Sequence, residues 1–412
     1  MFLSEEIKDK WQPVMEHEDL PKIQDATKRA ITLRLLENQE KALQEANVTG
    51  ANVDNWDPIL ISLVRRAMPQ LMAYDTIGVQ PMSGPTGLIF AMKSHYTGDA
   101  SSGAEALALP AGQPDVDFSG DEGTANQLST ADGEALGGFV AGGGAFKEMS
   151  FSIEKSSVTA ATRALKAKYS LELAQDLKAI HGLDAESELS NILSAEILAE
   201  INREVIEKIL AQATPGATSG TANAGTFDVA DAVDNRGARW GGERYKSLLI
   251  QINREANLIA KNTGRGAGNW LIVSADVASA LDMVAGLKEP NMDVGDSNPI
   301  DLSQGVSAGT LGGKYKVFID QFAASDSVTV GFKGSNMYDA GMFYCPYVPL
   351  QLMKSIGEED FQPRLGFKTR YGLIANPFAE TGAQSGAATA VNDAGSANAN
   401  RYYQKVQVAN LM

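Results

Sequence analysis

The sequence predicts an α+β fold, because it combines one very long helix with several separate strand-like runs. The long helix is predicted over residues 184–211, where apolar side chains recur every three or four positions without an interrupting Gly or Pro. Asp184 can cap its first turn, and Pro215 follows its end. At 1.5 Å per residue it would be roughly 40 Å long. We expect it to act as a backbone for other elements, the alternative being an ordinary core helix.

This predicted helix carries one apolar stripe, made by Leu189, Ile192, Leu193, Ile197, Ile201, Val205, Ile206 and Ile209. Shorter helices are predicted over residues 162–180, 239–262 and 275–285. Strands are predicted over residues 270–274, 314–320, 327–332, 342–350, 361–378 and 401–408. The strands between 270 and 350 and their two helices would form one α/β unit with a shared sheet.

A glycine-rich excursion separates two strand-like flanks early in the chain. Residues 98–146 contain eight acids, eleven glycines and no Lys, Arg or His. The flanks, residues 88–95 and 146–153, alternate between apolar and polar side chains as strands do. This pattern indicates a two-stranded arm with a flexible acidic tip, and plain disorder is the alternative. Without lysine, the tip cannot supply lysine side chains for covalent crosslinks.

The first 45 residues are highly charged, with ten acids and seven Lys and Arg. Residues 28–45 are predicted as a helix with Ile31, Leu35 and Leu36, and the whole segment as a detachable helical arm. The alternative is that the charges simply form a solvated helix face. Leu43-Gln44-Glu45 precedes Ala46, and the small polar residues after it predict an extended linker that a protease can reach.

Composition excludes several classes of protein. The chain has 412 residues, 51 acids and 35 bases, so its net charge of -16 disfavours a general affinity for nucleic-acid phosphates. The single cysteine, Cys345, excludes an internal disulfide, and no Cys and His cluster suits a metal. The amino terminus lacks the pattern of a signal peptide, and no apolar run is long enough for a membrane span. We therefore expect a soluble, non-exported protein.

No motif predicts an active site or a cofactor. Residues 264–268 resemble a dinucleotide loop, but a helix precedes them and a strand follows, the reverse of the required order. Residues 309–314 end in Lys followed by Tyr, not Ser or Thr, and indicate a turn instead of a phosphate loop. Residues 305–309 match the nucleophile-elbow pattern by chance. The only histidines lie far apart in the sequence, at His17, His95 and His181.

Seven segments resemble the major capsid protein of T-even-type tailed phages and keep that family's order along most of the chain. These segments are VRRAMPQLMAYDTIGVQPMSGPTG (64–87), LKAKYSLELAQDLKAIHGLDAESELSNIL (165–193), EINREV (200–205), DNRGARWGGERYKSLL (234–249), LGGKYKVFIDQ (311–321), NMYDAGMFYCPY (336–347) and GFKTRYGLIANPFAE (366–380). The resemblance implies the Hong Kong 97-type capsid fold, with the predicted long helix as its spine.

The resemblance also implies the domain plan of this fold. The parts are a cleavable amino-terminal propeptide arm (1–45), an N-arm (46–64), a peripheral domain (65–87, 160–235 and 351–412), an extended loop (88–159) and an axial domain (236–350). Some relatives carry a folded insertion between the positions of Lys93 and Lys147. The segment is much shorter here, so we expect that insertion to be absent or vestigial.

The function implied by the resemblance is structural. Copies would form hexameric capsomers of an icosahedral head that encloses the genome without specific DNA binding, assembled in the host cytoplasm. A prohead protease would cut after Glu45, in an L/I-x-E context with Leu43 and Ala46, and no cofactor or catalysis is implied. Implied partners are the vertex capsid protein, the prohead protease, an internal scaffold, the portal and decoration proteins. The alternatives are the pentameric vertex paralogue and an encapsulin-like compartment shell.

Overall fold

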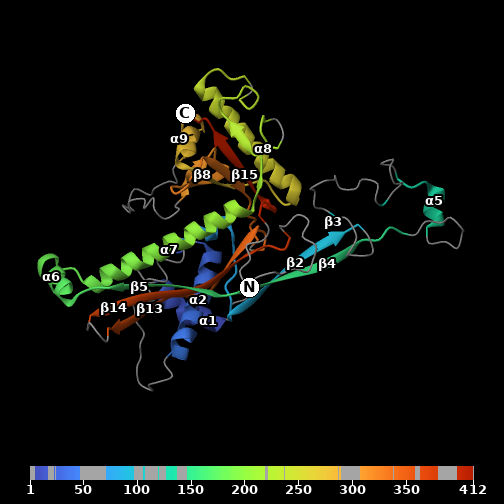
Figure 1. Ribbon diagram of the computed structural model, residues 1–412. Helices are drawn as coiled ribbons and strands as arrows, with labels where there is room; N and C mark the ends of the chain where they lie inside the picture. Colours follow the sequence, from blue (N-terminus) through green and yellow to red (C-terminus); the bar gives the residue numbers. More distant parts are fainter. Residues whose placement is uncertain are drawn as a thin grey trace.

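The computed structural model describes most of the chain except several internal segments and the two ends. The described residues are 5–16, 23, 25–46, 71–96, 105–106, 119, 127–136, 146–218, 221–235, 237–285, 287–288, 307–336, 338–357, 362–378 and 397–411. They form a mixed helix and sheet structure in which two sheets are built from segments far apart in the sequence (Figure 1). The predicted α+β class is confirmed.

The long helix α7, Ala185–Gln212, has the predicted bounds to within one residue. It begins at Asp184, whose carboxylate accepts a hydrogen bond from the Ser187 backbone N–H at 3.3 Å. Six of the eight predicted stripe residues are buried: Leu193, Ile197, Ile201, Val205, Ile206 and Ile209. Leu189 is half-buried, and Ile192 is wrong as a core prediction because it is 62% exposed. The stripe is therefore continuous only along the carboxyl-terminal part of the helix.

One sheet lies under α7 and has four strands in the order β1, β13, β14, β5 (Figure 1). Its strands are β1 (Gly78–Val79), β13 (Met342–Ile356), β14 (Pro363–Ala375) and β5 (Ala161–Lys168). Two predictions are corrected here. Residues 161–168 form a strand and not a helix, because they pair with β14 from Tyr371 to Arg364. The predicted strand 342–350 belongs to this sheet and not to the α/β unit, because β13 pairs with β14 along almost its whole length.

The second sheet has eight strands and forms the other lobe. Its strands are β6 (Ala213–Pro215), β7 (Thr226–Asp228), β8 (Trp270–Ser274), β9 (Leu287–Lys288), β10 (Ser307–Leu311), β11 (Tyr315–Asp320), β12 (Ser327–Gly331) and β15 (Asn400–Ala409). Helices α8 (Gly241–Thr263) and α9 (Ala275–Ala285) pack on it and match their predicted ranges closely. The last strand, β15, lies inside the sheet, because β12 flanks it on one side and β6 and β7 on the other.

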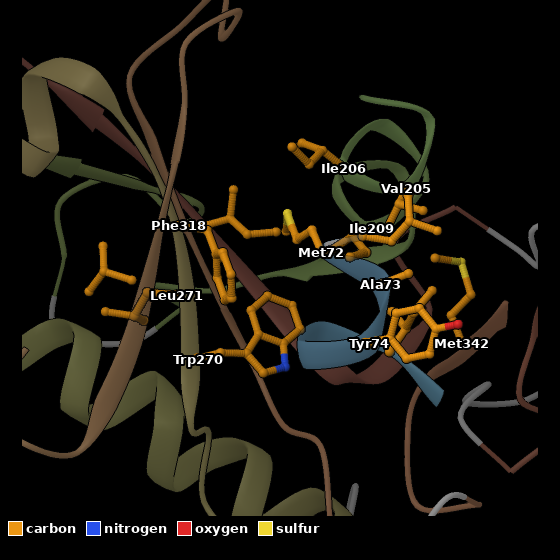
Figure 2. Close-up of a cluster of buried hydrophobic side chains, with 14 of the residues drawn as sticks. Met72, Ala73, Tyr74, Val205, Ile206, Ile209, Trp270, Leu271, Phe318 and Met342 are labelled. Carbon is orange, nitrogen blue, oxygen red and sulfur yellow. The ribbon is translucent and has the colours of Figure 1, made fainter. Parts of the chain in front are cut away.

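The two sheets meet at a shared core (Figure 2). The short helix α4, Ala73–Thr76, lies at this junction and buries Tyr74. Figure 2 places Tyr74 near Met342 of β13, and Trp270 and Phe318 of the eight-stranded sheet on the other side of α4. Ile209 and other residues of α7 cover the same region. The junction joins the two lobes through apolar contacts.

A third, three-stranded sheet projects from this body as an arm (Figure 1). Its central strand β2, Thr86–His95, pairs antiparallel with β4, Ser150–Thr159, and with the short β3, Glu105–Ala106. The predicted two-stranded arm is therefore confirmed at its base. Within the predicted acidic tip, the structure describes β3 and one short helix, α5, Thr130–Ala135. Of the other tip residues, only 119, 127–129, 136 and 146 are described.

Candidate assembly surfaces

The arm carries a row of large apolar side chains on one face, which we call the arm face. It consists of Leu88, Phe90 and Met92 on β2 and of Phe151 and Ile153 on β4. Strand geometry places them together, because alternate residues point to one side and Met92 lies directly opposite Ile153 in the register. Their exposed fractions range from 51% to 64%. Such a contiguous exposed apolar row is typical of a protein interface.

The other face of the arm differs in chemistry. At its base, Ile89 and Val158 are almost fully buried against Phe343 and Cys345 of the four-stranded sheet. Farther along, Lys93 and Glu154 form an ion pair with a 3.0 Å distance between Nζ and Oε2. The arm is therefore anchored by one face, which leaves the arm face for contacts with another molecule.

A second apolar surface lies at the opposite end of the molecule, at helix α6, Leu171–His181 (Figure 1). None of its residues is buried, although it carries several large apolar side chains. The exposed side chains here are Leu171, Leu173 and Ile180 of α6, Leu183, and Met353 and Ile356 of β13. Because the two apolar surfaces lie at opposite ends, one subunit can contact neighbours on two sides.

The amino-terminal helices are packed into the body. They are α1, Glu5–Met15, and α2, Ala26–Ala46. Ile31, Leu35 and Leu36 are each at most 2% exposed. The amide of Asn38 donates to the Met82 carbonyl at 2.7 Å and to the Tyr347 carbonyl at 3.0 Å. The interpretation of α2 as a purely solvated charged face is therefore wrong, because its apolar side covers the four-stranded sheet.

The predicted processing residues lie at the end of α2. Leu43, Glu45 and Ala46 belong to its last turns, and the helix ends at Ala46. The extended linker predicted after Ala46 lies outside the described residues. The structure thus gives Leu43 and Glu45 a helical backbone, as predicted for residues 28–45, and extends the helix to Ala46.

The histidines and the single cysteine are the side chains considered for a catalytic role. His95 ends β2 and its Nε2 lies 3.0 Å from the Ser152 hydroxyl, whereas His181 ends α6; His17 lies outside the described part of the chain. Burial raises the pKa of the Cys345 thiol to about 12, so it is protonated and unreactive at neutral pH. Across the segments that the structure describes, no group of three His, Cys, Asp or Glu is placed to hold a metal.

The glycine motifs also have ordinary structural roles. Residues 264–268 connect the end of α8 to β8, and Gly264 adopts a left-handed φ of 65° as the carboxyl-terminal cap of the helix. Residues 309–314 run from β10 into the turn before β11, as predicted. Of the nucleophile-elbow pattern, the described residues begin at Ser307 in β10. None of the helices that the structure describes is long and apolar enough to cross a lipid bilayer.

Comparison with known proteins decides the family. The model of the family "Major capsid protein Gp23" matches residues 53–408, which is most of the chain. The chain belongs to this family. As a Gp23-family member it is a structural protein of the tailed-phage head, located in the virion capsid, and it is not an enzyme.

Individual relatives agree along the whole Gp23-family chain. It is 40% identical to the major capsid protein of Vibrio phage KVP40, over 98% of this chain and 99% of the relative. It is 36% identical to the major capsid protein of Enterobacteria phage T4, over 98% and 99% of the two chains. The capsid vertex protein of phage T4 is 27% identical and aligns with only 55% of this chain. The major capsid proteins are therefore the nearer kin.

Two further comparisons concern length and structure. The alignment with the KVP40 protein has 515 positions, and this chain has 412 residues, so at least 103 positions of the relative have no counterpart here. A segment present in relatives and missing from this chain was expected from the sequence. Among solved structures, the capsid of Myoviridae phage XM1 matches 81% of this chain and 89% of that chain at 11% identity, with a TM-score of 0.40.

Proposed function

We propose that copies of this major capsid protein join as hexameric capsomers, in which the arm face of one subunit lies on its neighbour. The observation that carries the proposal is the apolar row on β2 and β4, whose side chains stay 51% to 64% exposed in the part of the subunit that the structure describes. A contact between two different surfaces of identical subunits closes into a ring when the rotation between subunits allows it. The arm provides one of these surfaces.

The energetic case rests on repetition. Fully burying one Leu, Ile, Phe or Met side chain stabilises by roughly 1.5–3 kcal/mol. Five side chains of the arm face could thus contribute several kcal/mol for each subunit after the costs of association. Because every subunit both gives and receives the contact, the same modest interaction is repeated throughout a shell.

We also propose that the chain is processed after Glu45 during maturation. The Leu43-Gln44-Glu45 sequence fits the cleavage context of the family, and α1 and α2 together form the part that would be removed. A protease binds its substrate in extended form, so the last turns of α2 must unwind first, and helix ends fray readily. Removal of residues 1–45 takes away ten acids and seven bases and changes the net charge from -16 to -13.

The remaining partners follow from this maturation scheme. The amino-terminal helices would face an internal scaffold, and the prohead protease would act on them. The portal and the vertex capsid protein would occupy the special positions of the shell, and decoration proteins would bind outside. The vertex paralogue is disfavoured for this chain by its lower identity and shorter match. Five-fold occupancy alone in electron cryomicroscopy would favour that alternative.

Three experiments test these proposals. Deletion of residues 98–146, with a short Gly and Ser connection, should abolish closed shells in electron micrographs while the subunit stays folded by circular dichroism. Normal shells would refute a role of the arm tip, residues 98–146, in assembly. Mass spectrometry of purified virions should find a mature chain that starts at Ala46, and a chain that starts at Met1 would refute the cut. DNA inside the particles would separate a phage head from an encapsulin-like compartment.

A further inference from the structure

A cavity of about 480 Å³ lies where the amino-terminal helix α2, the short helix α4 and the eight-stranded sheet meet. Asp25 and Lys28 border it from the start of α2, Asp75 from α4, and Trp270 from β8. Gly313 and Lys314 also line it, so the turn that only resembles a phosphate loop in sequence borders a real cavity. A cavity of this size can hold a small ligand.

The cavity wall carries an excess of positive charge. Four lysines line it, Lys28, Lys314, Lys316 and Lys333, against the two acids Asp25 and Asp75. The Asp75 carboxylate lies 3.4 Å from the Lys28 ammonium and 3.6 Å from that of Lys316, so it is shared between two cations. An anion in the cavity would balance the remaining charge.

Lys333 contributes the most buried of these charges. Desolvation lowers its pKa to about 8, and the neighbouring Lys28 and Lys316 act in the same direction, while Asp75 and Asp25 oppose them. Its ammonium donates to the Tyr74 carbonyl, a neutral acceptor. A bound anion would stabilise this charge more than a neutral carbonyl does.

Trp270 gives separate evidence that a hydrogen-bond acceptor is missing from the cavity. Its side chain is 1% exposed, and its indole Nε1 has no hydrogen-bond partner within the described parts of the chain. Figure 2 shows this nitrogen turned toward α4, the helix that gives Tyr74 and Asp75 to the cavity wall. The indole is held by Tyr403, with ring centroids 5.5 Å apart, and by Gly331, where a Cβ would lie 2.0 Å from the ring. Leaving a buried N–H without a partner costs free energy, which an acceptor in the cavity would recover.

We propose that this cavity binds a small oxyanion of the phosphate class, with Lys316, Lys333 and the indole N–H of Trp270 as donors. A phosphate offers several acceptor oxygens and at least one negative charge, which suits two ammonium groups and one N–H. Helix α2 forms one wall of the cavity in the full-length chain and so limits the size of the ligand. The ligands that fit are free phosphate and the phosphate of a mononucleotide. The site is independent of capsomer formation, so either proposal can fail without the other.

The test uses the unassembled full-length chain with inorganic phosphate as the probe, in chloride-balanced buffer of constant ionic strength. Titration calorimetry should show saturable one-to-one binding, and the indole N–H signal of Trp270 should shift in ¹H–¹⁵N spectra. Lys316→Gln should weaken binding roughly tenfold, because it removes one charge-assisted hydrogen bond. Its side chain is 57% exposed, so the variant should fold. Lys178→Gln, at an exposed position of α6, is the matched control and should bind normally.

The same titration distinguishes the two sources of phosphate. Tighter binding of adenosine monophosphate than of phosphate would identify a nucleotide, and equal or weaker binding would identify the free ion. The proposal is overturned if no saturable shift of Trp270 occurs, or if Lys178→Gln loses as much affinity as Lys316→Gln. Displacement of phosphate by a single-stranded oligonucleotide at the Trp270 signal would also overturn it, since the site would then accept a polymer.

Discussion

Met92 on β2 and Ile153 on β4 face each other directly across the ladder of the arm, and both side chains are more than 60% exposed. They occupy the middle of the arm face. The sequence indicates this relationship through the alternation of its two flanks, whereas the register that places them opposite each other comes from the structure. The pair is therefore the most direct point at which to test assembly.

Met92→Glu should prevent closed shells without unfolding the subunit. A carboxylate there would have to lose its water on contact with an apolar neighbour, at a cost of several kcal/mol if it stays charged. Electron microscopy shows whether closed shells form, and thermal unfolding shows whether the subunit is folded. The control is Met283→Glu, because Met283 of α9 is 65% exposed and lies outside the arm. If Met92→Glu still forms normal shells, the arm face is not an interface.

A chain that starts at Ala46 should expose apolar surface as an isolated subunit. It lacks Leu35 and Leu36, which the full-length chain buries, and their partners in the four-stranded sheet become accessible. We expect stronger binding of a hydrophobic dye and a lower melting temperature than for the full-length chain. Equal dye binding and equal melting temperatures would contradict this role of α2.

Loss of Glu204 should destabilise the packing of α7 on its sheet. The Arg163 guanidinium of β5 lies 2.6 Å from the Glu204 carboxylate, which also accepts a hydrogen bond from the Tyr371 hydroxyl of β14. Glu204→Ala leaves the partly buried Arg163 without this partner and should lower the free energy of unfolding by about 1–3 kcal/mol. Urea unfolding measures the change. Glu207→Ala, at an exposed pair with Arg203, should cost less than about 1 kcal/mol.

The stability contributed by Lys333 should depend on pH. Its pKa in the folded chain, about 8, lies below the ordinary value of 10.5, so between these values the unfolded chain holds a proton that the folded chain has released. Stability from this group therefore rises as pH increases from 8 to 10.5, and below pH 8 the full burial penalty applies. In phosphate-free buffer, the stability of Lys333→Met relative to wild type should fall between pH 7 and pH 10.5. A pH-independent difference would contradict the shift.

The contacts that the arm tip makes in the shell should be noncovalent. Residues 98–146 contain no lysine, so the tip cannot supply the amine for an isopeptide crosslink. Purified shells boiled in detergent should release monomers on a denaturing gel. A ladder of covalent multimers would contradict this expectation, and treatment with an added amine-reactive crosslinker provides the positive control.

Sequence periodicity predicted the elements whose apolar pattern is local. The bounds of α7, α8, β8 and α9 follow from such patterns to within one or two residues. The spacing of Leu165 and Tyr169, four positions apart, predicts helix for residues 162–168, but pairing with β14 decides their conformation. Likewise, no local signal tells that β13 joins β14 and not the α/β unit, because strand partners are chosen by tertiary contacts.

The candidate sites also differ in how far the sequence predicts them. The arm face follows from alternation at 88–95 and 146–153, and the processing residues follow from a resemblance in sequence. The cavity around Trp270 was not predictable, because Lys28 lies more than 200 residues before the other three lysines that line it, Lys314, Lys316 and Lys333. The many charged residues of α2 favoured a solvated helix, so its buried side was not predicted, although the sequence shows Ile31, Leu35 and Leu36 on this helix.

The position of β15 has a consequence for synthesis. This strand contains nearly the last residues of the chain, yet it is inserted between β12 and β6 in the interior of the larger sheet. Until β15 has been synthesised, β12 keeps an open edge whose backbone groups can pair with other chains. A polypeptide that stops before β15 thus cannot close this lobe, so the fold itself screens such copies before they can enter the growing head.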